Sequence, residues 1–194
     1  MPARIAPTEV PHPPEVAEVL HRMMPGDEEP IALFRLYARN LPLTEALHAW
    51  GSYQLSRRLS LGLRDREILI DRTCARCGCE YEWGVHIARF APRAGLTPAQ
   101  ITSLTHGSSA DTCWTTDRDR LLLDAADALH TGHDIDDTLW ERLSAEFSPE
   151  QLLDLLMLCG WYHAISFTAR ATRLTPEPGT PTFDGFLPPD PPKP

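Results

Sequence analysis

Residues 61–86 read LGLRDREILIDRTCARCGCEYEWGVH, and the interpretation of the whole chain starts from this stretch. No proline, which interrupts helices, occurs between Arg64 and Ala91, and Gly78 is the first break within that stretch. The pattern predicts one helix before Gly78 and a second helix from Cys79 to Ala91.

Three reactive side chains share one face of the second predicted helix. Cys79, Glu82 and His86 stand at positions i, i+3 and i+7, so a thiol, a carboxylate and an imidazole converge within about two turns. The first turn of a helix favours negative charge, and we therefore expect Cys79 to favour the thiolate. Cys77 would lie close to this site, whereas Cys74 would be packed one turn earlier.

The remainder of the chain also has helical patterning. Thr97-Pro98-Ala99-Gln100 and Ser148-Pro149-Glu150-Gln151 each combine a capping hydroxyl, a proline at the first helical position and a glutamine three residues after the cap. Sustained alternation of the strand type is absent, so the sequence predicts an all-α fold. The other expected helices lie within residues 16–23, 31–37, 43–53, 117–130, 136–147 and 152–170.

The prolines mark the ends of the folded body. Thirteen of the 19 prolines lie in the first 14 and last 19 residues, where they disfavour helices and central strands. We predict a proline-rich arm at 1–14, a helical domain at 15–175 and a second proline-rich arm at 176–194.

The composition narrows the range of partners. The chain of 194 residues has 27 acidic against 18 basic side chains and a net charge of -9, which argues against a nucleic acid partner. No uninterrupted apolar run approaches the roughly 18–20 residues of a membrane span, and the first residues lack the apolar core of a secretory signal. We expect a cytoplasmic protein that acts on a small molecule, without a nucleic acid or membrane partner.

The cysteines between residues 74 and 79 permit other interpretations. Cys74-x-x-Cys77 is typical of redox centres and of zinc sites, and zinc would need Cys79 and His86 as further ligands. The chain has no second Cys-x-x-Cys or His-x-x-x-His pair to support zinc, and a structural disulfide is not expected in the cytoplasm.

The spacing of four residues resembles the carboxymuconolactone decarboxylase family, which includes the alkylhydroperoxidase D proteins. That family has a glutamate, eleven residues, Cys-x-x-Cys, three residues and a histidine. Here Glu67, Cys79, Glu82 and His86 keep this register, with glutamate in place of the second cysteine, as in a family branch with Cys-x-x-Glu. The flanks that extend the resemblance are Ala32–Arg35, Leu63–Glu67, Ala94–Thr97 and Pro176–Gly179.

The resemblance implies an alkylhydroperoxidase D-like helical bundle and an acid–base lyase without a required cofactor. Glu67, Cys79, Glu82 and His86 would be the catalytic residues of a reaction on a small carbonyl or lactone acid. That reaction would be a decarboxylation, an isomerisation or an elimination through an enolate. We expect Arg72, Trp83 and His163 to contact the substrate, with Arg72 as partner for a substrate carboxylate or for Asp71.

Three alternatives stay open at this point. A thiol peroxidase or disulfide reductase would use the clustered cysteines, although Cys79 and Glu82 together cannot form a disulfide. A metal would be bound by Glu67, Glu82 and His86, with Cys79 as a fourth ligand. A non-catalytic relative would bind a ligand without turnover. The resemblance also implies a homo-oligomer, either a dimer, a trimer or a hexamer.

Overall fold

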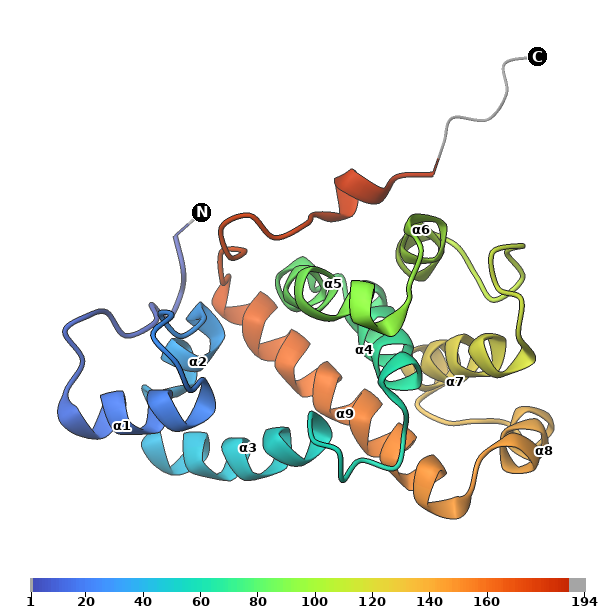
Figure 1. Ribbon diagram of the computed structural model, residues 1–194, viewed down its shortest axis with the longest axis horizontal. Coiled ribbons are helices and arrows are strands. Elements are labelled where there is room, and N and C mark those ends of the chain that lie inside the picture. Colours follow the sequence, from blue (N-terminus) through green and yellow to red (C-terminus); the bar gives the residue numbers. More distant parts are fainter. Residues whose placement is uncertain (1, 189–194) are drawn as a thin grey trace, which may run out of the picture.

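The computed structural model describes residues 2–188, and within them the chain is helical, which confirms the all-α prediction. Figure 1 shows α1, α2 and α3 at one end of the molecule and α6, α7 and α8 at the other, with α9 running between them. The helices of the described chain are α1 (Pro14–Met23), α2 (Ala32–Tyr37), α3 (Leu41–Gln54), α4 (Leu63–Arg76), α5 (Glu80–Ala94), α6 (Pro98–His106), α7 (Asp117–Gly132), α8 (Asp137–Glu146), α9 (Pro149–Thr172) and the short 3-10 helix η1 (Phe183–Phe186).

The central helix α4 is buried on all sides because it packs against α5, α6, α7 and α9. Its apolar residues Ile68, Leu69 and Ile70 have no exposed surface. Polar residues of the same helix are buried as well, including Glu67 and Asp71. Buried carboxyl groups need partners or a proton, so the interior of this helix is where ionisation can be controlled.

The turn between α4 and α5 has the form that the sequence predicts. Gly78 adopts a left-handed conformation with φ of 63°, and Cys79 is the N-cap residue of α5. The Cys79 N–H donates to the Cys74 carbonyl oxygen over 2.8 Å, which closes the end of α4. The second helix runs three residues beyond the predicted end at Ala91 and includes Pro92 in its last turn.

Both predicted helix starts are confirmed. Thr97 and Gln100 form a complete capping box at α6, and Ser148 and Gln151 form another at α9. Each box satisfies backbone N–H groups that would otherwise lack a partner at the start of a helix.

Helix α9 has 24 residues and forms much of the core. By length and composition it could cross a membrane, with a mean hydropathy of 1.3 in its most apolar window, which differs from the expectation that no apolar run approaches a membrane span. In this fold, 56% of that window is buried against the rest of the chain, as in the core helix of a folded domain.

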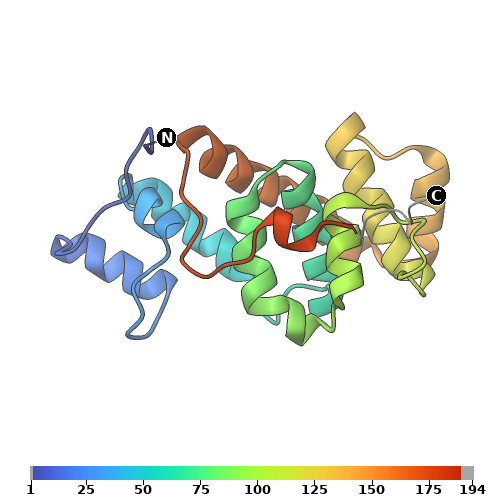
Figure 2. The same ribbon diagram turned by 90° about the horizontal axis from the view of Figure 1, so that it is seen from above.

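The chain ends are docked on the helical body. Residues after α9 cross α5 and lead to η1, as Figure 2 shows from above. Tyr81 donates its hydroxyl to the Glu177 carboxylate, and Trp83 packs edge-on against Phe183 and Phe186. At the other end, the Arg4 N–H donates to the Thr172 carbonyl oxygen. The last six residues of the predicted C-terminal arm lie outside the described residues.

Candidate active site

A cavity of about 480 Å³ lies between α2, α3, α5 and α9, with the end of α1 at its edge. Most of its wall is apolar, and Glu82, His86 and Tyr162 contribute polar groups. Arg22 and Arg89 also line it. A mostly apolar cavity with a few convergent polar groups is the usual form of a small-molecule site.

His86 is held from one side by Glu67. Its Nδ1 donates to the Glu67 Oε2 over 2.8 Å, and both side chains are buried. The other carboxylate oxygen of Glu67 accepts from the Arg66 guanidinium at 2.7 Å. Glu67 therefore has a partner on each oxygen and fixes the orientation of the imidazole ring.

The other ring nitrogen of His86 faces the cavity. Its Nε2 lies 3.0 Å from the Tyr162 hydroxyl and 3.5 Å from the Glu82 Oε1. The second oxygen of Glu82, Oε2, is buried and has no protein partner. Glu82, His86 and Tyr162 thus form a connected polar group at the cavity wall, in which the Glu82 Oε2 has unused capacity to accept a hydrogen bond.

The carboxylates around His86 favour its charged form. Burial alone lowers the pKa of His86, but the charge and hydrogen bond of Glu67, followed by those of Glu82, outweigh burial and raise the pKa to about 10. At neutral pH the ring is therefore an imidazolium, which can give up a proton to a bound molecule.

Asp71 lies one turn after Glu67 and is completely buried. Neither of its oxygens has a protein partner. Burial raises the pKa of Asp71 well above its usual value, and the negative charge of Glu67 raises it further. We infer that Asp71 stays protonated at neutral pH, which keeps a third negative charge out of this region.

The cysteines lie away from the cavity wall. Cys79 is buried at the N-cap of α5 and is not among the residues that line the cavity. Burial raises the pKa of the Cys79 thiol to about 11, because it outweighs the opposing hydrogen bonds. The expected thiolate at Cys79 is therefore wrong. Cys74 is fully buried, and burial raises its pKa well above the usual value.

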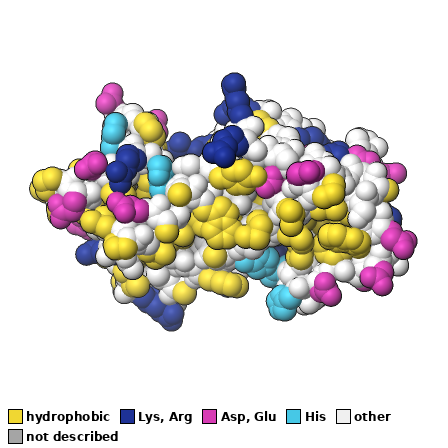
Figure 3. Space-filling model, turned by 90° about the horizontal axis from the view of Figure 1, so that it is seen from below, with side chains coloured by type: hydrophobic (Ala, Val, Ile, Leu, Met, Phe, Trp, Pro, Cys, Tyr) yellow, Lys and Arg dark blue, Asp and Glu magenta, His cyan; other side chains and the backbone are white. Residues whose placement is uncertain are grey.

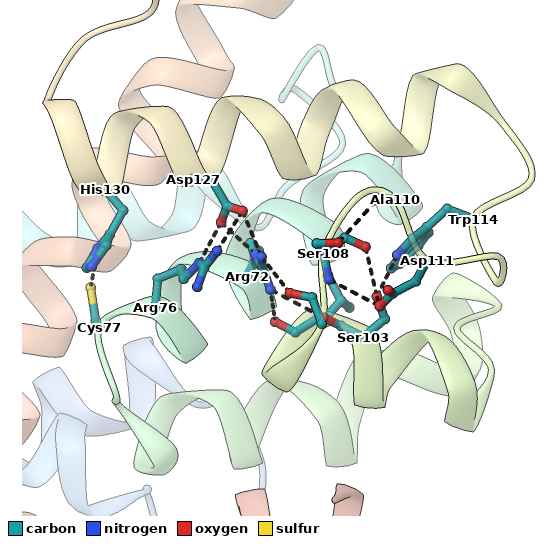
Figure 4. Close-up of polar contacts among 12 residues, drawn as sticks. Arg72, Arg76, Cys77, Ser103, Ser108, Ala110, Asp111, Trp114, Asp127 and His130 are labelled. Carbon is teal, nitrogen blue, oxygen red and sulfur yellow. Dashed lines mark hydrogen bonds and ion pairs between the residues drawn. The ribbon is translucent and has the colours of Figure 1, made fainter. Parts of the chain in front are cut away.

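Arg72 also lies outside the cavity, although we expected it at the substrate. Its five donor bonds go to both oxygens of Asp127 and to the carbonyl oxygens of Ser103, Leu104 and Gly107 (Figure 4). These bonds occupy all the N–H groups of the guanidinium, so none is left for a substrate or for Asp71.

The other two residues predicted to contact substrate are also placed elsewhere. Trp83 is fully buried under η1, and it does not line the cavity. His163 does not line the cavity either, and its ring stacks on His130. Of the seven predicted site residues, the structure brings together Glu67, Glu82 and His86.

Sequence reasoning missed two residues that contact this group. Tyr162 stands beside His163 in the sequence, but only the helical phase of α9 shows that it faces His86. Arg66 belongs to a polar run that resembles a solvated helix surface, and the packing of α4 turns it toward Glu67. His48, which also lines the cavity, lies on α3 among aromatic residues.

The predicted metal ligands Glu67, Glu82 and His86 are already engaged with one another. Both ring nitrogens of His86 have polar neighbours, and both oxygens of Glu67 accept hydrogen bonds. An imidazole binds a metal through a nitrogen lone pair, and at neutral pH His86 offers none, because its Nδ1 donates to Glu67 and its raised pKa keeps a proton on Nε2.

The family comparison covers the central part of the chain. Residues 43–128 match the model of the carboxymuconolactone decarboxylase family. This range runs from α3 into α7 and contains Glu67, Cys79, Glu82 and His86. No curated protein is similar enough in sequence to count as a relative.

Solved structures extend the fold comparison to nearly the whole chain. An uncharacterized peroxidase-related protein from Silicibacter sp. TM1040 has a TM-score of 0.76 at 19% identity, covering 94% of this chain and 97% of its own. The debrominase Bmp8, as a Cys-to-Ala variant in complex with 2,3,4-tribromopyrrole, has a TM-score of 0.74 at 13% identity, covering 92% and 94%.

A protein of unknown function from Agrobacterium tumefaciens, named as a candidate AhpD antioxidant defence protein, is 22% identical with a TM-score of 0.65, covering 73% of this chain and 95% of its own. The chain therefore has an all-helical, AhpD-like fold, and its central segment matches the model of the carboxymuconolactone decarboxylase family.

Proposed function

We propose that this protein is an acid–base lyase of the carboxymuconolactone decarboxylase type, which acts on a small carbonyl or lactone acid through an enolate. One observation carries the proposal: Glu82 and His86 both line the cavity, with the Glu82 Oε1 3.5 Å from the His86 Nε2 and with Glu67 behind His86. The match to the family over residues 43–128 supports an enzyme.

The cavity favours a small, mostly apolar substrate. Its volume of about 480 Å³ is in the range of small-molecule sites. Arg22 and Arg89 provide the positive charges that Arg72 does not, and Arg89 lies three residues after His86 on α5. We propose that Arg89 binds a carboxylate of the substrate that is not lost in the reaction.

The reaction needs a proton donor at the position where the enolate forms. In a decarboxylation, the C–C bond to the departing carboxylate breaks, carbon dioxide leaves, and the electron pair moves into the adjacent carbonyl system as an enolate. The His86 Nε2–H then gives its proton to the carbon, and the neutral ring regains a proton from water. In an isomerisation, Glu82 takes the proton from carbon before His86 returns one.

The thiol peroxidase alternative fits the structure less well. A peroxidatic cysteine must be a thiolate that the hydroperoxide can reach. Cys79 is buried away from the cavity, and its raised pKa keeps it as a thiol. The peroxidase-related name of a structural neighbour describes that protein.

A set of variants separates the two chemistries. Small β-keto acids and unsaturated lactone acids are incubated with the protein in D₂O, while NMR records substrate loss and deuterium at the α-carbon. We expect Glu82→Gln and His86→Asn to lower the rate by at least about 100-fold, the usual contribution of general acid–base groups. Glu141→Gln, on the exposed surface of α8, is the matched control and should keep the wild-type rate.

A variant without the three clustered cysteines tests the redox alternative. With Cys74, Cys77 and Cys79 all replaced by serine, the acid–base proposal expects the rate in D₂O to be retained. The proposal fails if Glu82→Gln keeps the full rate, or if the protein reduces organic hydroperoxides with a dithiol and loses that activity in Cys79→Ser.

We also propose a homo-oligomer that forms through the outer face of α9. The exposed positions Leu153, Met157, Gly160, Ala164 and Phe167 follow one another at intervals of four and three residues. No Asp, Glu, Lys or Arg occurs from residue 155 to residue 169. Hydrophobic side chains also form a broad band on the face shown in Figure 3. An uncharged seam at this spacing fits a second copy of the same helix around a two-fold axis.

A further inference from the structure

A cysteine and two histidines meet at a place that the proposed acid–base site does not use. The Cys77 Sγ lies 3.8 Å from the His130 Nδ1, and that nitrogen lies 3.1 Å from the His163 Nε2. All three atoms lie within 4.8 Å of one another. None of these residues lines the cavity.

Three separate helices bring these atoms together. Cys77 caps the end of α4, His130 lies in the last turn of α7, and His163 lies near the middle of α9. The close-up in Figure 4 shows Cys77 and His130 pointing toward each other from their two helices. Since α4 packs against both α7 and α9, the cluster lies where three helices meet and not in a loop.

A hydrogen bond fixes the tautomer of His163. Its Nδ1 lies 2.8 Å from the Cys159 carbonyl oxygen, which can only accept, so Nδ1 carries the proton. The lone pair of Nε2 then points toward His130 and Cys77. One ring nitrogen bound to a backbone carbonyl oxygen, with the other directed toward the remaining ligands, is the usual arrangement around a histidine that binds metal.

From these contacts we propose that Cys77, His130 and His163 form a binding site for one zinc ion, with water as the fourth ligand. Thiolate and imidazole are the donors that zinc prefers. Bond lengths of about 2.0–2.1 Å to nitrogen and about 2.3 Å to sulfur place tetrahedral ligands about 3.3 Å apart for two nitrogens and about 3.6 Å apart for nitrogen and sulfur. The distances of 3.1 and 3.8 Å approach these values.

The surroundings are compatible with a bound cation. Arg170 donates to the Cys77 carbonyl oxygen. Burial raises the pKa of the Cys77 thiol, and the Ser166 hydroxyl and the charge of Arg170 oppose that rise without cancelling it. Arg76 is paired with Asp127, which accepts from it at 2.7 and 2.8 Å. His130 and His163 are half-buried, so a water molecule can reach the fourth position.

Bound zinc would tie the ends of α4 and α7 to α9. Cys77 is two residues before Cys79, so the metal would fix the turn that leads into α5. Helix α5 carries Glu82 and His86. The zinc site is independent of the proposed reaction, because none of its three ligands lines the cavity. Failure of the acid–base proposal would leave the zinc proposal unaffected.

Metal titration of the full chain tests this proposal. The protein is treated with a chelator, reduced and titrated with Zn²⁺ against a chromophoric competitor. We expect one Zn²⁺ per chain, and binding at least about 100-fold weaker in Cys77→Ser and His130→Gln, since loss of even an outer partner of a metal ligand commonly costs about 10–100-fold. Cys113→Ser and His21→Gln, which change the same residue types outside the cluster, should bind as tightly as wild type.

Cobalt provides a readout that identifies the ligands. Co²⁺ bound at this site should show thiolate-to-cobalt charge-transfer absorption, which Cys77→Ser should lose. Circular dichroism verifies the fold of each variant, and His163→Gln is a second imidazole variant if His130→Gln does not fold. The proposal is overturned if the wild-type chain binds no zinc, or if Cys77→Ser and the histidine variants bind it as tightly as wild type. In that case the two rings form only a stacked, hydrogen-bonded pair.

Discussion

At the scale of single residues, two carboxyl groups one turn apart on α4 have opposite roles. Glu67 has partners on both oxygens and supports the positive charge of His86. Asp71 has no protein partner, and its raised pKa keeps it protonated. Both residues are fully buried on the same helix, so burial alone does not distinguish them. The difference arises from the partners that packing gives to Glu67 and not to Asp71.

The protonation of Asp71 predicts a pH-dependent effect of Asp71→Asn. Above pH ~3.9 the unfolded chain ionises this carboxyl group while the folded chain does not, so wild-type stability falls as pH rises toward the raised folded pKa. The asparagine side chain does not ionise in either state, so it adds no such dependence on pH. As the pH rises through this window, the free energy of unfolding of Asp71→Asn should therefore increase relative to that of wild type by up to about 1.4 kcal/mol per pH unit.

Urea denaturation at a series of pH values measures that difference. Asp137→Asn, at the exposed start of α8, is the control and should show a nearly constant difference from wild type. A constant difference for Asp71→Asn as well would mean that Asp71 is ionised in the folded protein.

At the scale of elements, the C-terminal segment depends on a glycine in α5. A Cβ at Gly84 would lie 2.7 Å from the Pro181 carbonyl oxygen, which is too close for a backbone atom. The absence of a side chain lets the segment that contains Glu177 and η1 lie directly on the helix.

Gly84→Ala should therefore loosen the C-terminal segment while α5 itself remains helical. We expect a destabilisation of about 1–3 kcal/mol, the usual cost of overpacking, and faster proteolysis between residues 176 and 186. Trp83 fluorescence should also change, because Phe183 and Phe186 would no longer cover its ring.

Gly132→Ala is the matched control for this substitution, since a Cβ there meets nothing within 4 Å. It should keep the wild-type rate of proteolysis. Equal proteolysis of Gly84→Ala and wild type would show that the segment does not lie against α5 as described.

At the scale of the whole molecule, the outer face of α9 predicts the state of association. Leu153→Glu should place a charge in the uncharged seam and convert the oligomer to monomer, as measured by light scattering after gel filtration. Leu187→Glu makes the same change at a leucine of similar exposure, 59% against 64%, away from α9. The seam is not an interface if wild type is a monomer or if both variants keep its mass.

The sequence predicts local features of the fold but not the contacts across it. Capping boxes and the shared face of Glu82 and His86 depend on residues close in the chain, so the helix period reveals them, whereas Glu67 is indicated by the spacing of the family that the sequence resembles. Asp127, which accepts hydrogen bonds from Arg72, is 55 residues from it in sequence, and Tyr162 is 76 residues from His86. Such contacts depend on how α4, α7 and α9 pack, which no local pattern specifies.

The sequence also does not predict which polar residues are buried. The run Arg64–Glu67 has the composition of a solvated helix surface, yet three of its four residues are buried in ion pairs. The partners Arg118 and Asp119 come from the first turn of α7. Where one helix is covered on every side, an amphipathic pattern gives no information about which polar groups reach solvent.

Glu67 and Glu82 hold His86 as an imidazolium at the wall of the cavity. Because the folded pKa is raised, the resulting stability is complete below pH ~6.5 and is lost as pH rises through about 10. ¹⁵N NMR of the histidine side chains measures this ionisation without any substrate, and His86→Asn assigns the signals. The account predicts that His86 titrates near pH 10 in wild type and at distinctly lower pH in Glu67→Gln, whereas titration of wild-type His86 near pH 6.5 would contradict it.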